Sequence, residues 1–220
     1  MTKKEIEKIL GSQSRVYNSE NELVLHFAID LILQHKISIE NIYFERCFSV
    51  EFVTRSNGKT KNKESYIDLV TLMDKKRIGF EFKYCTRELN FKDYNEIDIK
   101  LKNQSGNDAI RFGFRKDIYR LETLIKEREL DLGFAILLTN DKNLFKSYPA
   151  ENKFLDKNYR FTNLILKEDL GWYNNGTPDK HWTKNEKNDV ILDLSKPYAI
   201  NWEKGSHTND SFHFCVVEIN

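Results

Sequence analysis

Residues 66–84, with the sequence YIDLVTLMDKKRIGFEFKY, constrain the fold of this chain more than any other stretch. Two apolar runs flank the polar segment 74–77, a pattern typical of a β-hairpin. The strands also contain Asp68, Glu81 and Lys83 at positions that look suited to core side chains. Burying charges without a metal ion or a partner is costly, so this pattern indicates that the three residues have a function.

The register of the hairpin predicts where these charges lie. A turn centred between Lys75 and Lys76 sets Asp68 opposite Lys83, with Glu81 diagonal to Asp68. Residues that face each other across a ladder, or that lie two apart in one strand, share a face of the sheet. The sequence therefore predicts that the two carboxylates and the ammonium converge.

This combination of groups suits hydrolysis of phosphodiesters. Two carboxylates, with water and a phosphate oxygen, suit Mg²⁺ or Mn²⁺, whereas zinc prefers His or Cys ligands. A lysine beside such a metal can orient the attacking water and stabilise charge on the phosphate. The alternative is a structural salt-bridge cluster, because opposite charges across an edge hairpin are mildly stabilising.

The segments around the hairpin predict the fold class. Residues 18–36 have a capping-box pattern before a long apolar run, which indicates a buried helix. Residues 41–54 are rich in aromatic and β-branched side chains, 108–129 have the spacing of an amphipathic helix, and 131–141 form a short apolar run typical of a buried strand. The order helix, three strands, helix, strand predicts a three-layer α/β/α sandwich with a mixed central sheet.

The expected domain organisation follows from a change in amino-acid composition near residue 143. Beyond it the chain is polar and amide-rich, with short segments typical of strands. We expect a core domain over residues 1–142 and a β-rich C-terminal extension over 143–220 packed on it.

Residues 68–83 resemble the PD-(D/E)XK nuclease superfamily, which has the restriction-endonuclease-like fold. That pattern is an Asp on one strand followed by (Asp/Glu)-x-Lys on the next, here Asp68 and Glu81-Phe82-Lys83, with Ile67 where a Pro is frequent. The core order of the superfamily matches the order expected here over roughly residues 19–140. The segments DIYRLE and GFAILLTND further resemble a group of uncharacterised bacterial proteins of this superfamily.

The resemblance implies a Mg²⁺-dependent or Mn²⁺-dependent endonuclease acting on DNA, in restriction, repair or mobile-element defence. It also implies an auxiliary metal-binding Glu on the first core helix. Glu22 is the candidate and Glu20 the alternative, although Glu22 fits a capping box with Ser19 equally well. The remaining alternative is a catalytically silent nuclease-fold protein that binds nucleic acid or a partner protein.

Five residues are candidates for contacts with a DNA backbone: Arg111, Arg115, Gln104, Lys59 and Lys61. Positively charged and amide side chains commonly bind phosphates, but a solvated helix face and a solvated loop explain them too. The net charge of +1, from 35 basic and 34 acidic residues, leaves room only for a local basic patch. Restriction-type cleavage of both strands usually needs a dimer, so a homodimer is a possible partner state, although the sequence shows no dimerisation element.

The cellular setting expected from the sequence is the cytoplasm. The N-terminal residues lack the apolar segment of a signal peptide, and no apolar run approaches the length that spans a bilayer. Cys47, Cys85 and Cys215 are odd in number and widely spaced, as expected for reduced thiols.

Overall fold

A computed structural model describes residues 1–92, 96–104, 106–146, 157–161, 163–174, 177–178, 189–206 and 212–220. Its main sheet has six strands in the order β1-β2-β3-β6-β12-β11. Their bounds are β1 Ile42–Val53, β2 Thr60–Met73, β3 Lys76–Cys85, β6 Leu132–Thr139, β12 His213–Ile219 and β11 Glu203–Lys204. The pair β3–β6 is parallel and the other neighbouring pairs of this sheet are antiparallel, so the sheet is mixed.

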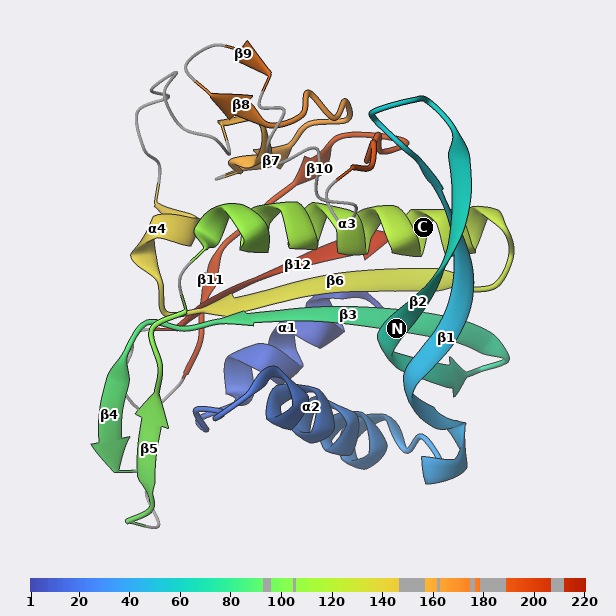
Figure 1. Cartoon of the computed structure of the whole chain (residues 1–220). Coiled ribbons are helices and arrows are strands. Elements are labelled where there is room, and N and C mark those ends of the chain that lie inside the picture. The colour runs from blue at the N-terminus through green and yellow to red at the C-terminus, as the bar shows by residue number, and fades with distance from the viewer. Residues whose placement is uncertain are drawn as a thin grey trace.

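Helices cover both faces of this sheet. Helices α1 (Lys3–Ser12) and α2 (Glu20–His35) lie against one face, and α3 (Asn107–Lys126) lies against the other (Figure 1). Each face has its own apolar cluster: one unites α1 and α2 with the sheet, and the other unites α3 with the sheet. The expected three-layer α/β/α sandwich is therefore confirmed.

The connection from β3 to β6 carries α3, as a parallel pair requires a crossover. A short hairpin of β4 (Leu89–Lys92) and β5 (Asp98–Leu101) precedes α3 and projects from the sheet (Figure 1). Because β3 has helices on both faces, its side chains are buried on both. The charged residues in the second half of this strand, Glu81 and Lys83, are therefore placed inside the molecule, whereas Lys76 and Arg77 at its start reach the surface.

The turn between β2 and β3 differs from the sequence prediction, which was wrong about the register. Its two central residues are Asp74 and Lys75, with φ of 51° and 64°, and Met73 pairs with Lys76. Positive φ at both positions is the requirement of a type I′ turn, whose twist matches that of the strands. The register shifts by two, which keeps each side chain on its predicted face and brings Asp68 level with Glu81 rather than with Lys83.

The C-terminal part of the chain adds to the sandwich in two ways. Strand β12 pairs along its whole length with β6 and so belongs to the central sheet. Short strands, β7 (Leu164–Ile165), β8 (Tyr173–Asn174), β9 (Thr177–Pro178) and β10 (Tyr198–Ala199), lie beyond α3 (Figure 1). Apolar residues of this region join the α3 cluster, so α3 is covered on two sides. Along the described residues, no helix combines the length and apolar character needed to cross a bilayer.

Gly79 is expected to be essential for the close packing of β3. A Cβ at this position would lie 2.6 Å from Leu130 Cδ1 and 3.1 Å from Leu121 Cδ2. Overpacking of a buried site costs about 1–3 kcal/mol, so Gly79→Ala should lower the urea midpoint of unfolding. Gly11→Ala in α1 is the control, because its Cβ would meet only Phe214 at 3.9 Å and should stabilise the helix by about 0.5–1 kcal/mol. Equal stability of Gly79→Ala and the wild type would contradict this packing.

Candidate functional site

Asp68 lies where β2 separates from β3. Pairing of the two strands ends at Leu69 opposite Phe80. Beyond this point the Oδ2 atom of Asp68 accepts a hydrogen bond from the backbone N–H of Phe82 at 2.7 Å. The carboxylate thus substitutes for a ladder bond and is fixed against the Glu-x-Lys motif of β3.

Glu81 and Lys83 lie on the α3 side of the sheet. Phe80, Phe82 and Tyr84 of the same strand join the apolar cluster formed with α1 and α2. Because successive side chains of a strand point to opposite faces, the intervening Glu81 and Lys83 face α3. The sequence prediction that these two residues share a face is confirmed.

Two residues of α3 pair with these charges. Arg120 Nη2 lies 2.6 Å from Glu81 Oε1, and Lys83 Nζ lies 2.9 Å from Asp117 Oδ2. Arg120 also bridges to Asp117 at 2.8 Å. Glu81 is fully buried, and its Oε2 atom has no hydrogen-bond partner among the described residues. The four side chains form a network in which Glu81 and Asp117 are buried, Lys83 and Arg120 are partly exposed, and one carboxylate oxygen is left unsatisfied.

Glu20, at the start of α2, completes the acidic group. Its Oε2 atom accepts a hydrogen bond from the backbone N–H of Tyr84 at 2.7 Å. It lies close enough to Lys83 and Asp68 for both to act on its pKa. The first turn of α2 therefore contributes a carboxylate to the site through Glu20.

Glu22 has a different role in the structure. Its Oε2 atom accepts a hydrogen bond from the backbone N–H of Asn18 at 2.7 Å, and its own N–H donates to Ser19 Oγ at 3.1 Å. Both bonds belong to the N-terminal cap of α2. Of the two glutamates considered from the sequence, the structure brings Glu20 to Asp68 and keeps Glu22 at the cap.

The electrostatic balance of this group is acidic. The carboxylates of Glu20, Asp68, Glu81 and Asp117 surround the two cations Lys83 and Arg120, an excess of two negative charges when all are ionised. Burial raises the pKa of Glu20 and of Asp68, and it raises the pKa of Glu81 well above its usual range. Burial alone would lower the pKa of Lys83, but the surrounding carboxylates, Asp117 foremost, raise it. Lys83 is therefore a cation at neutral pH.

The raised pKa of Asp68 predicts a pH-dependent cost in stability. A carboxyl that binds its proton more tightly when folded loses stability as the pH rises from its unfolded pKa towards its folded pKa. Asp68→Asn, which stays neutral, should therefore unfold at a higher urea concentration than the wild type at pH 7. The difference should disappear below pH 3.8, the ordinary pKa of an aspartate side chain. A variant that is less stable than the wild type at pH 7 would contradict this electrostatic account.

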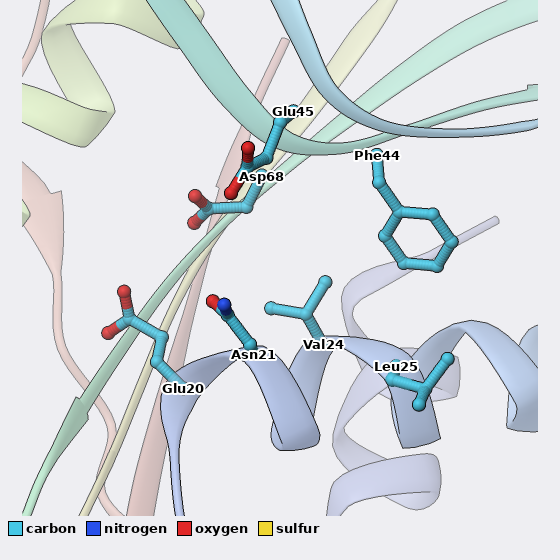
Figure 2. A pocket seen from close by; sticks show the side chains of 7 residues that line it. All are labelled: Glu20, Asn21, Val24, Leu25, Phe44, Glu45 and Asp68. Carbon is cyan, nitrogen blue, oxygen red and sulfur yellow. The ribbon is translucent and has the colours of Figure 1, made fainter.

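A pocket of about 310 Å³ opens beside Asp68. Figure 2 shows the carboxylates of Asp68, Glu45 and Glu20 at one end and the side chains of Phe44 and Leu25 towards the other. Glu45 lies across from Asp68 in the β1–β2 pair, at a position where the ladder is interrupted. Its φ of 46° is rare for a residue with a side chain. Strained backbone of this kind tends to occur at functional sites.

The candidates for DNA contacts lie in three different places. Arg111 and Arg115 are buried because the C-terminal region covers α3. Arg115 donates to the carbonyls of Leu166, Lys167 and Leu192 at 2.7–2.9 Å, and Arg111 donates to the carbonyl of Asn143. In this structure the guanidinium groups of both arginines hold the C-terminal region and are not presented on the surface.

The other three candidates remain on the surface. Gln104 is exposed, although it exchanges hydrogen bonds with Thr86 at the base of the β4–β5 hairpin. Lys59 lies in the loop between β1 and β2, and Lys61 is the second residue of β2; both are exposed. These lysines are accessible to a polyanion but lie apart from the acidic group.

Sequence reasoning does not single out Asp117, Arg120 or Glu45 as site residues. The spacing of Asp117 and Arg120 indicates an i, i+3 ion pair on a solvated helix surface, and that pair is present. Its burial against Glu81 depends on the rotation of α3, which the apolar stripe of that helix could have indicated. Glu45 carries no sequence signal, because its position depends on the β1–β2 register.

Comparison with known proteins found a weak structural similarity. No protein-family model matches the chain, and no curated protein matches it. A solved structure titled "Crystal structure of SSO0001" aligns with 53% of this chain and 43% of its own length, at 15% sequence identity and a TM-score of 0.27. The aligned part thus spans less than half of that protein.

Proposed function

We propose that this chain is a divalent-metal-dependent nuclease that hydrolyses phosphodiester bonds of DNA. The observation that carries the proposal is the group of Asp68, Glu20 and the buried Glu81 around the cation Lys83, with an excess of negative charge. Like charges held together at a cost in stability indicate a site that binds a ligand of opposite charge. The cytoplasm is the location that we propose.

The donor set fits Mg²⁺ or Mn²⁺. No three Asp, Glu, His or Cys side chains of the described residues are arranged to hold a metal ion among themselves. Mg²⁺ does not require such a cage, because it commonly binds through one or two carboxylates and completes its shell with waters and phosphate oxygens. Asp68 and Glu81 are those carboxylates in our proposal, and the Oε2 atom of Glu81, unpartnered among the described residues, supplies a free oxygen.

The protein groups divide the chemical work. A bound cation would polarise the phosphate and lower the pKa of a water molecule. Lys83, held by Asp117 at 2.9 Å and by the carbonyl of Phe82 at 2.8 Å, orients the attacking water and stabilises the negative charge that builds on the phosphate. Arg120 balances Glu81 and keeps the buried network together.

A cleavage assay tests this function. Purified protein is incubated with plasmid, linear and single-stranded DNA in Mg²⁺, Mn²⁺ or EDTA, beside the Asp68→Asn variant. We expect cleavage by the wild type with either metal, none in EDTA and none by Asp68→Asn. A wild type that leaves all three substrates intact with both metals would contradict the proposal. Cleavage of both strands at one position would further support a homodimer.

A matched pair of variants on α2 tests the auxiliary acid. Glu20→Gln should reduce cleavage, because it removes a carboxylate beside Lys83 and Asp68. Glu22→Gln should leave cleavage unchanged, because its oxygen still accepts the capping bond from Asn18. Initial rates at limiting Mg²⁺ are the measurement. If Glu22→Gln reduces the rate and Glu20→Gln does not, the assignment of the auxiliary acid is reversed.

The second candidate is a catalytically silent protein that binds nucleic acid. The ion pairs of Glu81 with Arg120 and of Lys83 with Asp117 favour it, because they neutralise two residues of the motif without a metal. Such a protein would shift DNA in a gel equally well in Mg²⁺ and in EDTA. A metal requirement for DNA binding, lost in Asp68→Asn, would favour the nuclease.

A further inference from the structure

The pocket beside Asp68 has two chemically different ends. Val24, Leu25 and Phe44 form an apolar end, and Asn21 places an amide between this end and the carboxylates (Figure 2). Phe44 is 48% exposed and Leu25 is 48% exposed, so the apolar end is open to an incoming ligand. Asp68 belongs both to this pocket and to the proposed metal site.

The size and lining of the pocket select one kind of occupant. About 310 Å³ is at the small end of ligand pockets, which suits one ring system rather than a length of polymer. An aromatic ring with aliphatic neighbours offers a stacking surface to a nucleobase, since every base has a π-face. The carboxylates of Glu20 and Glu45 repel a second phosphate, so the uncharged part of a nucleotide is the part that fits.

We propose that this pocket binds the unstacked base of the nucleotide next to the scissile phosphate, and that the substrate is therefore single-stranded or frayed DNA. The inference rests on the proposed function, because a phosphate placed at Asp68 puts its neighbouring base within reach of Phe44. The amide of Asn21 supplies a hydrogen-bond donor and an acceptor for the base or sugar. An intact duplex would have to unpair and flip this base before binding, which costs energy.

A binding measurement tests the pocket separately from cleavage. Fluorescence anisotropy gives the dissociation constants of a labelled thymidine 12-mer and of a 12-unit abasic strand with the same phosphates. In this binding measurement Ca²⁺ replaces Mg²⁺, since Ca²⁺ is also a hard cation that binds oxygen ligands. The variants are Phe44→Ala, Phe44→Trp and Tyr66→Ala. Tyr66 is the matched control, because it is an exposed aromatic residue of the same β1–β2 hairpin that does not line the pocket.

The wild type should bind the thymidine strand about 5- to 150-fold more tightly than the abasic strand, the range expected for one stacked base. Phe44→Ala should remove this difference by weakening only the thymidine strand, whereas Phe44→Trp and Tyr66→Ala should preserve it. A duplex of the same length should bind more weakly than the single strand. Equal affinities of the wild type for the two strands, or equal effects of Phe44→Ala and Tyr66→Ala, would overturn the inference.

The pocket and the proposed function can be contradicted independently. Metal-dependent cleavage without base-dependent binding would overturn the pocket and leave the nuclease standing. Base-dependent binding that requires Phe44, in a protein that cleaves nothing in Mg²⁺ or Mn²⁺, would support the pocket and overturn the nuclease. Binding of a second copy of this chain at the apolar end, detected as a concentration-dependent dimer that Phe44→Ala dissolves, would overturn the assignment of a base to the pocket.

Discussion

Lys83→Met should lower kcat for DNA cleavage by about 10²–10³-fold, which is the usual effect of removing one preorganised electrostatic group. Met keeps most of the side-chain length and removes the charge, so the attacking water and the phosphate lose their stabilising cation. Affinity for Mn²⁺ should persist or increase, because a competing cation has left the carboxylate group. Single-turnover cleavage rates and a Mn²⁺ titration measure the two effects.

The stability of this variant needs its own control. Removing Lys83 leaves Asp117 buried with one of its two cations lost, and breaking a buried ion pair costs about 3–5 kcal/mol. The double variant Lys83→Met/Asp117→Asn removes the stranded charge and should recover most of that stability without recovering cleavage. A well-folded Lys83→Met protein that cuts at the wild-type rate would exclude a catalytic role for Lys83.

Arg115→Met should destabilise the protein by about 3–5 kcal/mol, because hydrogen bonds to a charged group contribute about 1.5–3 kcal/mol each and are not fully additive. Arg115 is 2% exposed and donates to three carbonyls of the C-terminal region. Burial lowers its pKa, yet it remains charged at neutral pH. Urea denaturation measures the loss, and Arg115→Lys should fall between the wild type and the Met variant.

Lys126→Met is the matched control on the same helix. Lys126 is exposed in the last turn of α3, and surface substitutions of this kind usually change stability by less than about 0.5 kcal/mol. If Arg115 instead contacted DNA, its replacement would weaken DNA binding and leave the urea midpoint unchanged. That result would contradict the placement of the C-terminal region on α3.

Local patterns in the sequence were sufficient to predict the layers and the shared face of the motif. The period of two in β3 places Glu81 and Lys83 together whatever the turn, because a register shift of two residues preserves the face. The exact register was missed because it depends on positive φ at Asp74 and Lys75, and neither residue type requires that conformation. The alternation of side chains along β3 and the order of helices and strands were therefore enough to predict the layers and the face that Glu81 and Lys83 share.

The remaining site residues depend on tertiary contacts that a single sequence does not encode locally. Glu20 and Glu22 are two residues apart on a helix, so they point in different directions, and the packing of α2 decides which one meets Asp68. The helical pattern of α3 predicts that Arg115 is exposed, but in the structure the C-terminal region covers it. A short-range pattern contains no information about this burial of Arg115. The carbonyls that bind it belong to residues that lie 51 to 77 positions further along the chain.

Calorimetric titration of the wild type with Mn²⁺, beside Asp68→Asn and the capping control Glu22→Gln, tests most directly whether the hairpin holds a metal. We predict one Mn²⁺ per chain for the wild type and for Glu22→Gln, and no measurable binding for Asp68→Asn. Absence of binding to the wild type, or equal binding to folded Asp68→Asn, would show that Asp68, Glu81 and Lys83 form a structural ion-pair network instead of a metal site.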